Sequence, residues 1–148
     1  MLAAQGNAFA QTTYEQDLQA LTKAIQRHDD ASATRQIAAA RERYKGNTEV
    51  EAIALRFECS KGDFGHYNQA RHQALQASQS RELAQALAAC RVESGMTDAR
   101  NRLAHGDNAG AIRVAQPLYR YGPDPYGAGL ILAQAYLRNN QPQEAGRI

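Results

Sequence analysis

Residues 106–148 read GDNAGAIRVAQPLYRYGPDPYGAGLILAQAYLRNNQPQEAGRI, and this stretch decides the fold class. Asp107 is placed to cap one helix, and Asp124 followed by Pro125 is a typical start for the next, because both residue types suit helix N-termini. In the second helix, apolar residues fall on two faces, with Leu130, Ala133 and Leu137 on one and Leu132 and Tyr136 on the other. A helix that is apolar on two faces is covered on both sides, which predicts an all-α stack of antiparallel helical hairpins.

Small residues recur at a fixed spacing in the same stretch. Ala111 and Ala145 lie 34 residues apart, each near the start of a helix that follows a tight turn. The chain here resembles the tetratricopeptide repeat, whose period is 34 residues. The matching positions are Leu132, Ala133, Tyr136 and Ala145 in the last repeat, and Gly106, Ala111 and Pro123 in the repeat before it. The resemblance implies a right-handed solenoid, in which small residues let paired helices approach closely.

The repeat is degenerate. Arg102 stands at its tyrosine position and Gly129 at its tryptophan position. Upstream, the equivalent alanines Ala33 and Ala70 are 37 residues apart, and Ala70 is 41 residues from Ala111. Sel1-like repeats, which have longer and variable periods, are the alternative within the same architecture.

Helix signals continue toward the N-terminus. Thr12 and Glu15 have the spacing of a capping box, which predicts a first helix that starts at Thr12 and ends near Arg27. A second helix follows the cap at Asp29-Asp30 and ends at Gly46. Three further expectations are a third helix capped by Asn47 or Thr48, a turn at Gly62 or Gly65, and a fourth helix with Tyr67, Ala70 and Ala74.

Two residues in the second half are expected to interrupt helices. Gly95 is expected to stop the helix that carries Leu83, Leu87 and Cys90, which leaves a short helix from Thr97 to His105. Pro117 is expected to bend or end its helix, because proline lacks the backbone donor.

The first ten residues differ from the rest. Ala8-Phe9-Ala10 places small residues as a signal peptidase requires, after a short apolar Leu2-Ala3-Ala4. Residues 1–10 are therefore interpreted as the remnant of a secretory signal or as a disordered tail. Residues 11–148 form the repeat domain, which is expected to be truncated inside its last repeat. A secreted bacterial chain of this kind would lie in the periplasm.

Cys59 and Cys90 are expected to form a disulfide. Each ends an apolar stripe near the C-terminus of a helix that comes first in its hairpin, and first helices lie side by side in a solenoid. An oxidising compartment favours the bridge. The alternative is two buried free thiols that act as small apolar residues.

Charge and hydropathy limit the partners. The 17 basic and 15 acidic residues are interspersed and leave a net charge of +2, so no nucleic-acid partner is expected. No apolar run approaches the roughly 20 residues that cross a bilayer, so no membrane insertion is expected.

The titratable residues do not form a catalytic or metal-binding motif. The four histidines lie in different segments, and neither a His-x-x-x-His nor a Cys-x-x-Cys spacing occurs. The serines and paired acidic residues suit helix caps and first turns. The sequence therefore predicts neither an enzyme nor a bound metal or cofactor.

The resemblance implies a binding groove on the concave face of the solenoid. Carried over by position, its candidate residues are Arg100, Leu130, Gln134, Leu137 and Arg138. The function expected is a protein-interaction scaffold of the cell envelope, with partners in exopolysaccharide (cellulose-like) synthesis or export, as in the outer-membrane subunit of cellulose synthase. The alternative is a rigid periplasmic spacer or a Sel1-like adaptor in another envelope assembly.

Overall fold

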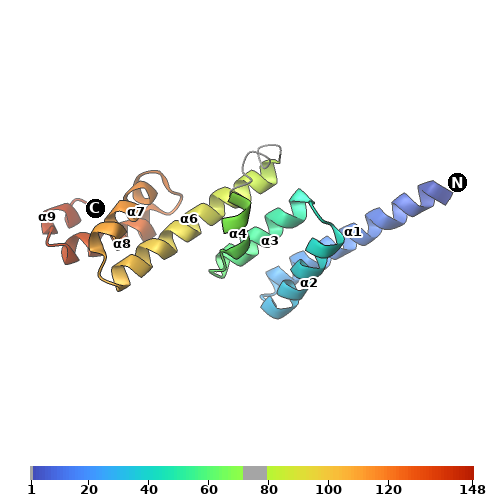
Figure 1. Cartoon of the computed structure of the whole chain (residues 1–148), viewed down its shortest axis with the longest axis horizontal. Helices are drawn as coiled ribbons and strands as arrows, with labels where there is room; N and C mark the ends of the chain where they lie inside the picture. The colour runs from blue at the N-terminus through green and yellow to red at the C-terminus, as the bar shows by residue number, and fades with distance from the viewer. Residues whose placement is uncertain (1, 72–79) are drawn as a thin grey trace.

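The computed structural model describes residues 2–71 and 80–148, with side chains from residue 13 onward, and the regular elements of these residues are all helices. In chain order they are α1 (Leu2–Gln26), α2 (Asp30–Arg43), α3 (Thr48–Ser60), α4 (Gly65–Ala70), α6 (Arg81–Ala104), α7 (Asn108–Tyr121), α8 (Pro125–Arg138) and α9 (Pro142–Ala145). Figure 1 shows them following one another along an elongated molecule, from α1 at one end to α9 at the other. The predicted all-α class is confirmed.

Local capping sets most of the helix starts. Asn47 Oδ1 accepts hydrogen bonds from the backbone N–H groups of Glu49 and Val50, both at 3.0 Å, and so satisfies two free donors of α3. Four other helices have a cap of the same kind, in which one side chain accepts a hydrogen bond from a backbone N–H of the first turn. These caps are Asp29 for α2, Ser80 for α6, Asp107 for α7 and Asp124 for α8. Gly46, Gly62 and Gly106 all have positive φ in the turns between helices. The caps predicted at Asp29, Asn47, Asp107 and Asp124 and the turns predicted at Gly46 and Gly62 are thus confirmed. Ala74 lies outside the described residues.

Two predicted helix boundaries are wrong. The first helix begins at Leu2 and not at Thr12, because the residues before Thr12 are mostly good helix formers and no proline stops them. Pro117 does not end its helix, because α7 continues to Tyr121. Leu118 and Tyr119 in its last turn pack against the core, and this packing outweighs the loss of one backbone donor.

The prediction that Gly95 ends a helix is also wrong. One continuous helix, α6, runs from Arg81 to Ala104, so the separate short helix expected from Thr97 to His105 does not exist. A Cβ at Gly95 would stand 3.0 Å from Cδ1 of Leu118 on α7. Gly95 therefore lets α6 and α7 approach each other closely and does not form a turn.

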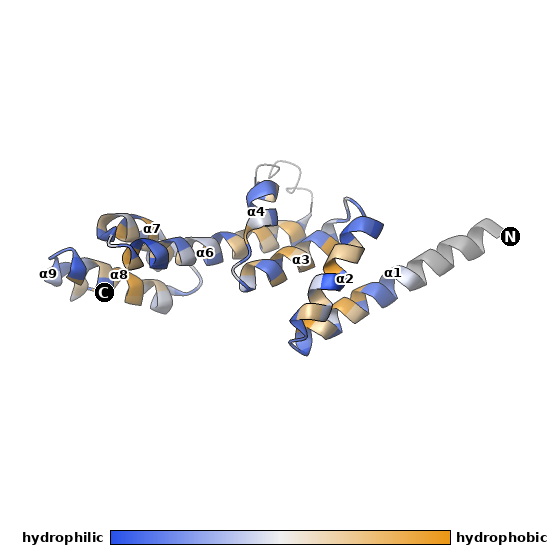
Figure 2. Ribbon diagram, turned by 60° about the horizontal axis from the view of Figure 1, so that its bottom comes forward, coloured by the Kyte–Doolittle hydropathy of each residue, from blue (hydrophilic) through white to orange (hydrophobic). Residues whose placement is uncertain are grey.

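Three apolar clusters form the core. The first joins α1, α2 and α3 around Leu21, Ile37 and Phe57. The second joins α3, α4 and the first half of α6, and the third joins the second half of α6 to α7 and α8. Figure 2 shows the hydrophobic segments where neighbouring helices face one another. Because α6 belongs to two clusters, it connects the middle of the molecule to its C-terminal part.

Candidate functional site

Four of the five predicted groove residues converge between α6 and α8. Arg100 on α6 faces Leu130, Gln134 and Arg138 on α8 across a hollow of about 400 Å³. The lining is completed by Leu103, Ala104, Gly127 and Ile131. Leu137, the fifth predicted residue, is not part of this lining and lies 57% exposed on α8.

The helix register explains this convergence. Gly127, Leu130, Gln134 and Arg138 are spaced by three or four residues, which places them on one face of α8. The cap at Asp124, whose Oδ1 accepts from the N–H of Gly127 at 2.9 Å, sets where that face begins. On the other wall, the unbroken α6 presents Arg100, Leu103 and Ala104 one turn apart. We call this hollow the arginine groove.

The arginine groove is basic. Its lining contains two arginines and no acidic residue. Arg138 Nη1 donates to the backbone carbonyl of Leu103 at 3.2 Å, and the carbonyl of Arg138 accepts from Asn108 Nδ2 at 3.2 Å. Among the described residues, Arg100 has neither a hydrogen-bond nor an ion-pair partner. Both guanidinium groups are thus without a carboxylate and can bind one.

The acidic residues nearby are already engaged. Asp107 accepts from the Gly110 N–H and from Arg102, and these contacts lower the pKa of Asp107 below its usual value. Asp124 caps α8, and Glu144 pairs with Arg147 at 3.1 Å. Residues 100–148 contain six arginines but only these three carboxylates. The C-terminal part therefore carries an excess of positive charge that the whole-chain value conceals.

A second hollow lies on the other side of α8 and is mostly apolar. It measures about 420 Å³ and is lined by Tyr119, Pro125, Tyr126, Gly129, Leu130, Ala133, Ala145 and Ile148. Leu130 borders both this hollow and the arginine groove. Sequence reasoning missed the second hollow, although Tyr126, Leu130, Ala133 and Leu137 have the spacing of one helix face.

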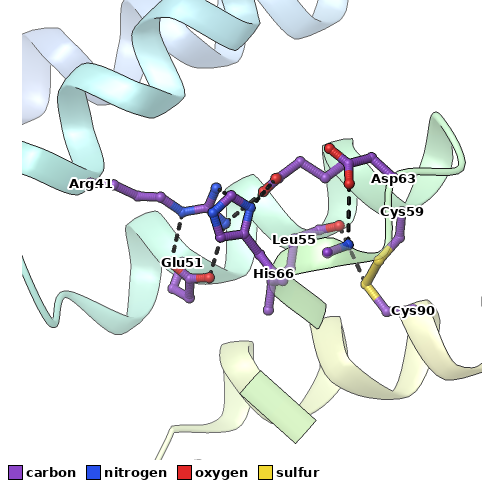
Figure 3. A network of polar contacts seen from close by, with 9 residues as sticks. Arg41, Glu51, Leu55, Cys59, Asp63, His66 and Cys90 are labelled. Carbon is purple, nitrogen blue, oxygen red and sulfur yellow. Dashed lines mark hydrogen bonds and ion pairs between the residues drawn. A yellow bond between two sulfur atoms is a disulfide. The ribbon is translucent and has the colours of Figure 1, made fainter. Parts of the chain in front are cut away.

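A third hollow, of about 460 Å³, lies beside a network of charged side chains from three helices. Arg41 on α2 binds Glu51 at 2.9 Å and Glu58 at 2.5 Å, both on α3. His66 is the second residue of α4. Its Nδ1 lies 2.6 Å from Oε2 of Glu58 and 3.0 Å from Nη1 of Arg41. Figure 3 shows Arg41 reaching toward Glu51 and His66.

Arg41 gives this network its positive charge. Burial by itself would lower the pKa of Arg41, but the hydrogen bonds to Glu51 and Glu58 outweigh burial and raise that pKa. The guanidinium is therefore a fixed positive charge that joins α2 to α3. No sequence signal identified it, because its members come from separate helices.

The disulfide between Cys59 and Cys90 is confirmed, and Figure 3 shows it close to His66. It joins α3 to α6 with a Cα–Cα distance of 5.4 Å, within the range usual for such bonds. The expectation that both cysteines lie near helix ends holds for Cys59 alone. Cys90 lies in the interior of α6, because Gly95 does not end that helix.

The predicted repeat positions differ in burial. Ala33 and Ala111 are fully buried in the core. Gly106 has a φ of +82° in the turn between α6 and α7. The remaining positions are partly buried or exposed, namely Ala70, Pro123, Ala133, Tyr136 and Ala145.

Comparison with known proteins gave no relatives. No protein-family model, no curated protein and no solved structure matches this chain. Within residues 2–71 and 80–148, no three potential ligands are grouped as a metal site would require. None of the described helices is long and apolar enough to cross a bilayer.

Proposed function

We propose that this chain is a non-catalytic protein-interaction scaffold, built as a degenerate tetratricopeptide-like solenoid, and that the arginine groove is its binding site. One observation carries the proposal: Arg100, Leu130, Gln134 and Arg138 were assigned to a groove from their sequence positions, and they line one hollow. Residues that only face solvent on separate helices are not expected to line one hollow together.

The chemistry of the groove suits a protein ligand. Arginine is enriched at protein interfaces, where its planar guanidinium pairs with carboxylates through two hydrogen bonds. Leu130 and Ile131 add apolar surface beside the two arginines, and Gln134 adds both a donor and an acceptor. A mixed surface of this kind recognises a peptide segment through its side chains and its backbone together.

The proposed setting is the bacterial periplasm, in an assembly for exopolysaccharide synthesis or export. The Cys59–Cys90 disulfide supports an oxidising compartment, because structural disulfides are rare in the cytosol. The link to exopolysaccharide export rests on the resemblance of the helical repeat to the periplasmic parts of such exporters.

Site-specific photo-cross-linking tests the binding function. A photoreactive amino acid replaces Gln134 in the groove of the full chain in cells, and the matched control replaces exposed Ala38 on α2. We expect an envelope protein to be cross-linked from position 134 and not from position 38, and the adduct to disappear when Arg100→Glu and Arg138→Glu are added. A rigid spacer without a ligand would give no specific adduct from either position.

A further inference from the structure

The outer face of α8 carries an apolar stripe without a partner in the described residues. Tyr126 is 78% exposed, Leu130 51% and Leu137 57%, and Ala133 lies between them. Their spacing of four, three and four residues puts them in one row along three turns of the helix. Among the described side chains, the exposed large apolar residues all lie between Tyr121 and Ile148. An exposed apolar patch of this kind marks an interaction surface.

The form of the stripe fits a helix. Side chains in a row at helical spacing make a ridge, and a second helix packs its own row beside such a ridge. The hollows on both sides of Leu130 provide the space that the side chains of a packed helix occupy. Ala133, between Leu130 and Leu137 in the stripe, is small and only partly buried, so an incoming helix can approach α8 closely there.

The charge beside the stripe selects the partner. Arg100 and Arg138 lie along one side of it in the arginine groove, and neither is paired with a carboxylate among the described residues. A helix that lies along α8 would bring the residues on its own flank to these two guanidinium groups. Carboxylates at that flank would form charge-assisted hydrogen bonds, whereas lysines would be repelled.

A second copy of this chain does not supply those carboxylates. Between residues 98 and 148 the acidic residues are Asp98, Asp107, Asp124 and Glu144, and each already caps a helix or pairs with an arginine. In a twofold contact through this face, the arginines of both copies would approach one another. The charges therefore favour a different protein.

We infer that the α8 stripe and the arginine groove together bind an acidic amphipathic α-helix of a partner protein. The partner's apolar residues would cover Leu130 and Leu137, and the carboxylates on its flank would bind Arg100 and Arg138. The inference rests on the proposed scaffold function and adds the conformation and charge of the ligand. It differs from recognition of an extended peptide, because the apolar contacts follow the spacing of a helix.

Fluorescence anisotropy with designed peptides tests the inference on the full chain. The first probe is an amphipathic helix as long as α8, 14 residues or about 21 Å, with leucines in one row and glutamates on one flank. The second has lysines in place of the glutamates. The third keeps the glutamates but has central prolines, which prevent a helix.

We expect the acidic helix to bind at least about tenfold more tightly than either other probe, and its affinity to fall as salt rises. Arg100→Glu with Arg138→Glu should weaken binding at least about tenfold. The control pair Arg27→Glu and Arg35→Glu, exposed and remote, should leave binding unchanged. Leu130→Asp should abolish binding, whereas Ala88→Asp on the exposed side of α6 should not, with folding of each variant checked by circular dichroism.

Different failures have different meanings. Equal binding of the proline probe would overturn the helical ligand and leave the scaffold function standing. Equal binding of the lysine probe, or failure of all three probes to bind, would overturn the acidic helix as ligand, while the cross-linking experiment would still judge the scaffold. A dimer in sedimentation equilibrium that Leu130→Asp dissociates would assign the stripe to a second copy and overturn the inference.

Discussion

Leu118 on α7 occupies the space that a side chain at position 95 of α6 would need, since its Cδ1 lies 3.0 Å from the place of a Cβ at Gly95. The residue that looks like a helix stop in the sequence is thus the contact point of two helices. Leu118 also packs against the third apolar cluster, which joins α6, α7 and α8 and includes Leu103 and Ile131 of the arginine groove.

Gly95→Ala should therefore have an effect that depends on Leu118. Alanine in a helix interior is favoured over glycine by about 1 kcal/mol, but Leu118 must move to admit the methyl group. We expect Gly95→Ala to stabilise the Leu118→Ala variant by about this amount and to stabilise the unmodified chain less, or to destabilise it. Urea unfolding of the four proteins measures the coupling, and an equal effect in both backgrounds would contradict the contact.

Ala111→Leu should destabilise the chain by about 1–3 kcal/mol, because a fully buried position on α7 has no room for a branched side chain. Ala109→Leu on the same helix is exposed and should be close to neutral, which controls for helix propensity. Ala145→Leu should cost less than Ala111→Leu because Ala145 is only partly buried. Equal thermal midpoints for Ala109→Leu and Ala111→Leu would argue against the close packing of α7.

The disulfide should contribute substantially to stability. It closes a loop of 31 residues, for which the chain-entropy model predicts about 3–4 kcal/mol. Replacing Cys59 and Cys90 together with alanine should therefore lower the urea midpoint strongly. Intact-mass measurement should show no alkylation of the denatured chain without reductant and two alkyl groups after reduction. Two groups before reduction would rule out the bond.

Arg41→Met should destabilise the molecule by about 2–4 kcal/mol, because it leaves the nearly buried Glu58 without its positive partner. Arg43→Met removes an exposed contact to Asp17 and should cost much less than Arg41→Met, because water screens an exposed ion pair. Adding Glu58→Met to Arg41→Met should recover part of the loss. Chemical unfolding of the three variants measures these differences in stability. Equal losses of stability for Arg41→Met and Arg43→Met would show that the network does not stabilise the fold.

Asp17 should make the stability of the first hairpin depend on pH. A hydrogen bond from Tyr44 at 2.6 Å and a second from Arg43 hold the pKa of Asp17 below its usual value. Since the folded pKa lies below the unfolded value of about 4, the contribution is complete above that pH and is lost as the pH falls through the folded pKa. Asp17→Asn should flatten the acid side of the stability profile. Glu15→Gln, an exposed neighbour on α1, should leave the profile unchanged.

Local features of the chain were predictable from the sequence because they depend on residues only a few positions apart. Asp29, Asn47, Asp107 and Asp124 cap helices whose N–H groups lie two or three residues away. The alternation of apolar and polar residues likewise requires only the helical period. The groove residues came from the resemblance to the tetratricopeptide repeat, and those on α8 line one hollow because they share one helix face.

The tertiary structure decided whatever depends on the approach of distant segments. Whether Gly95 ends a helix or admits Leu118 depends on α7, which no local pattern around Gly95 contains. The Arg41 network and the meeting of Arg100 with Arg138 likewise require helices to pack at particular angles. The sequence by itself determined where α2, α3, α7 and α8 begin and which of their faces are apolar, because capping hydrogen bonds and helical periodicity act over short distances. Side-chain packing decided three further features: the continuous α6, the disulfide in the interior of that helix and the basic groove. Packing acts only between residues that are in contact in space.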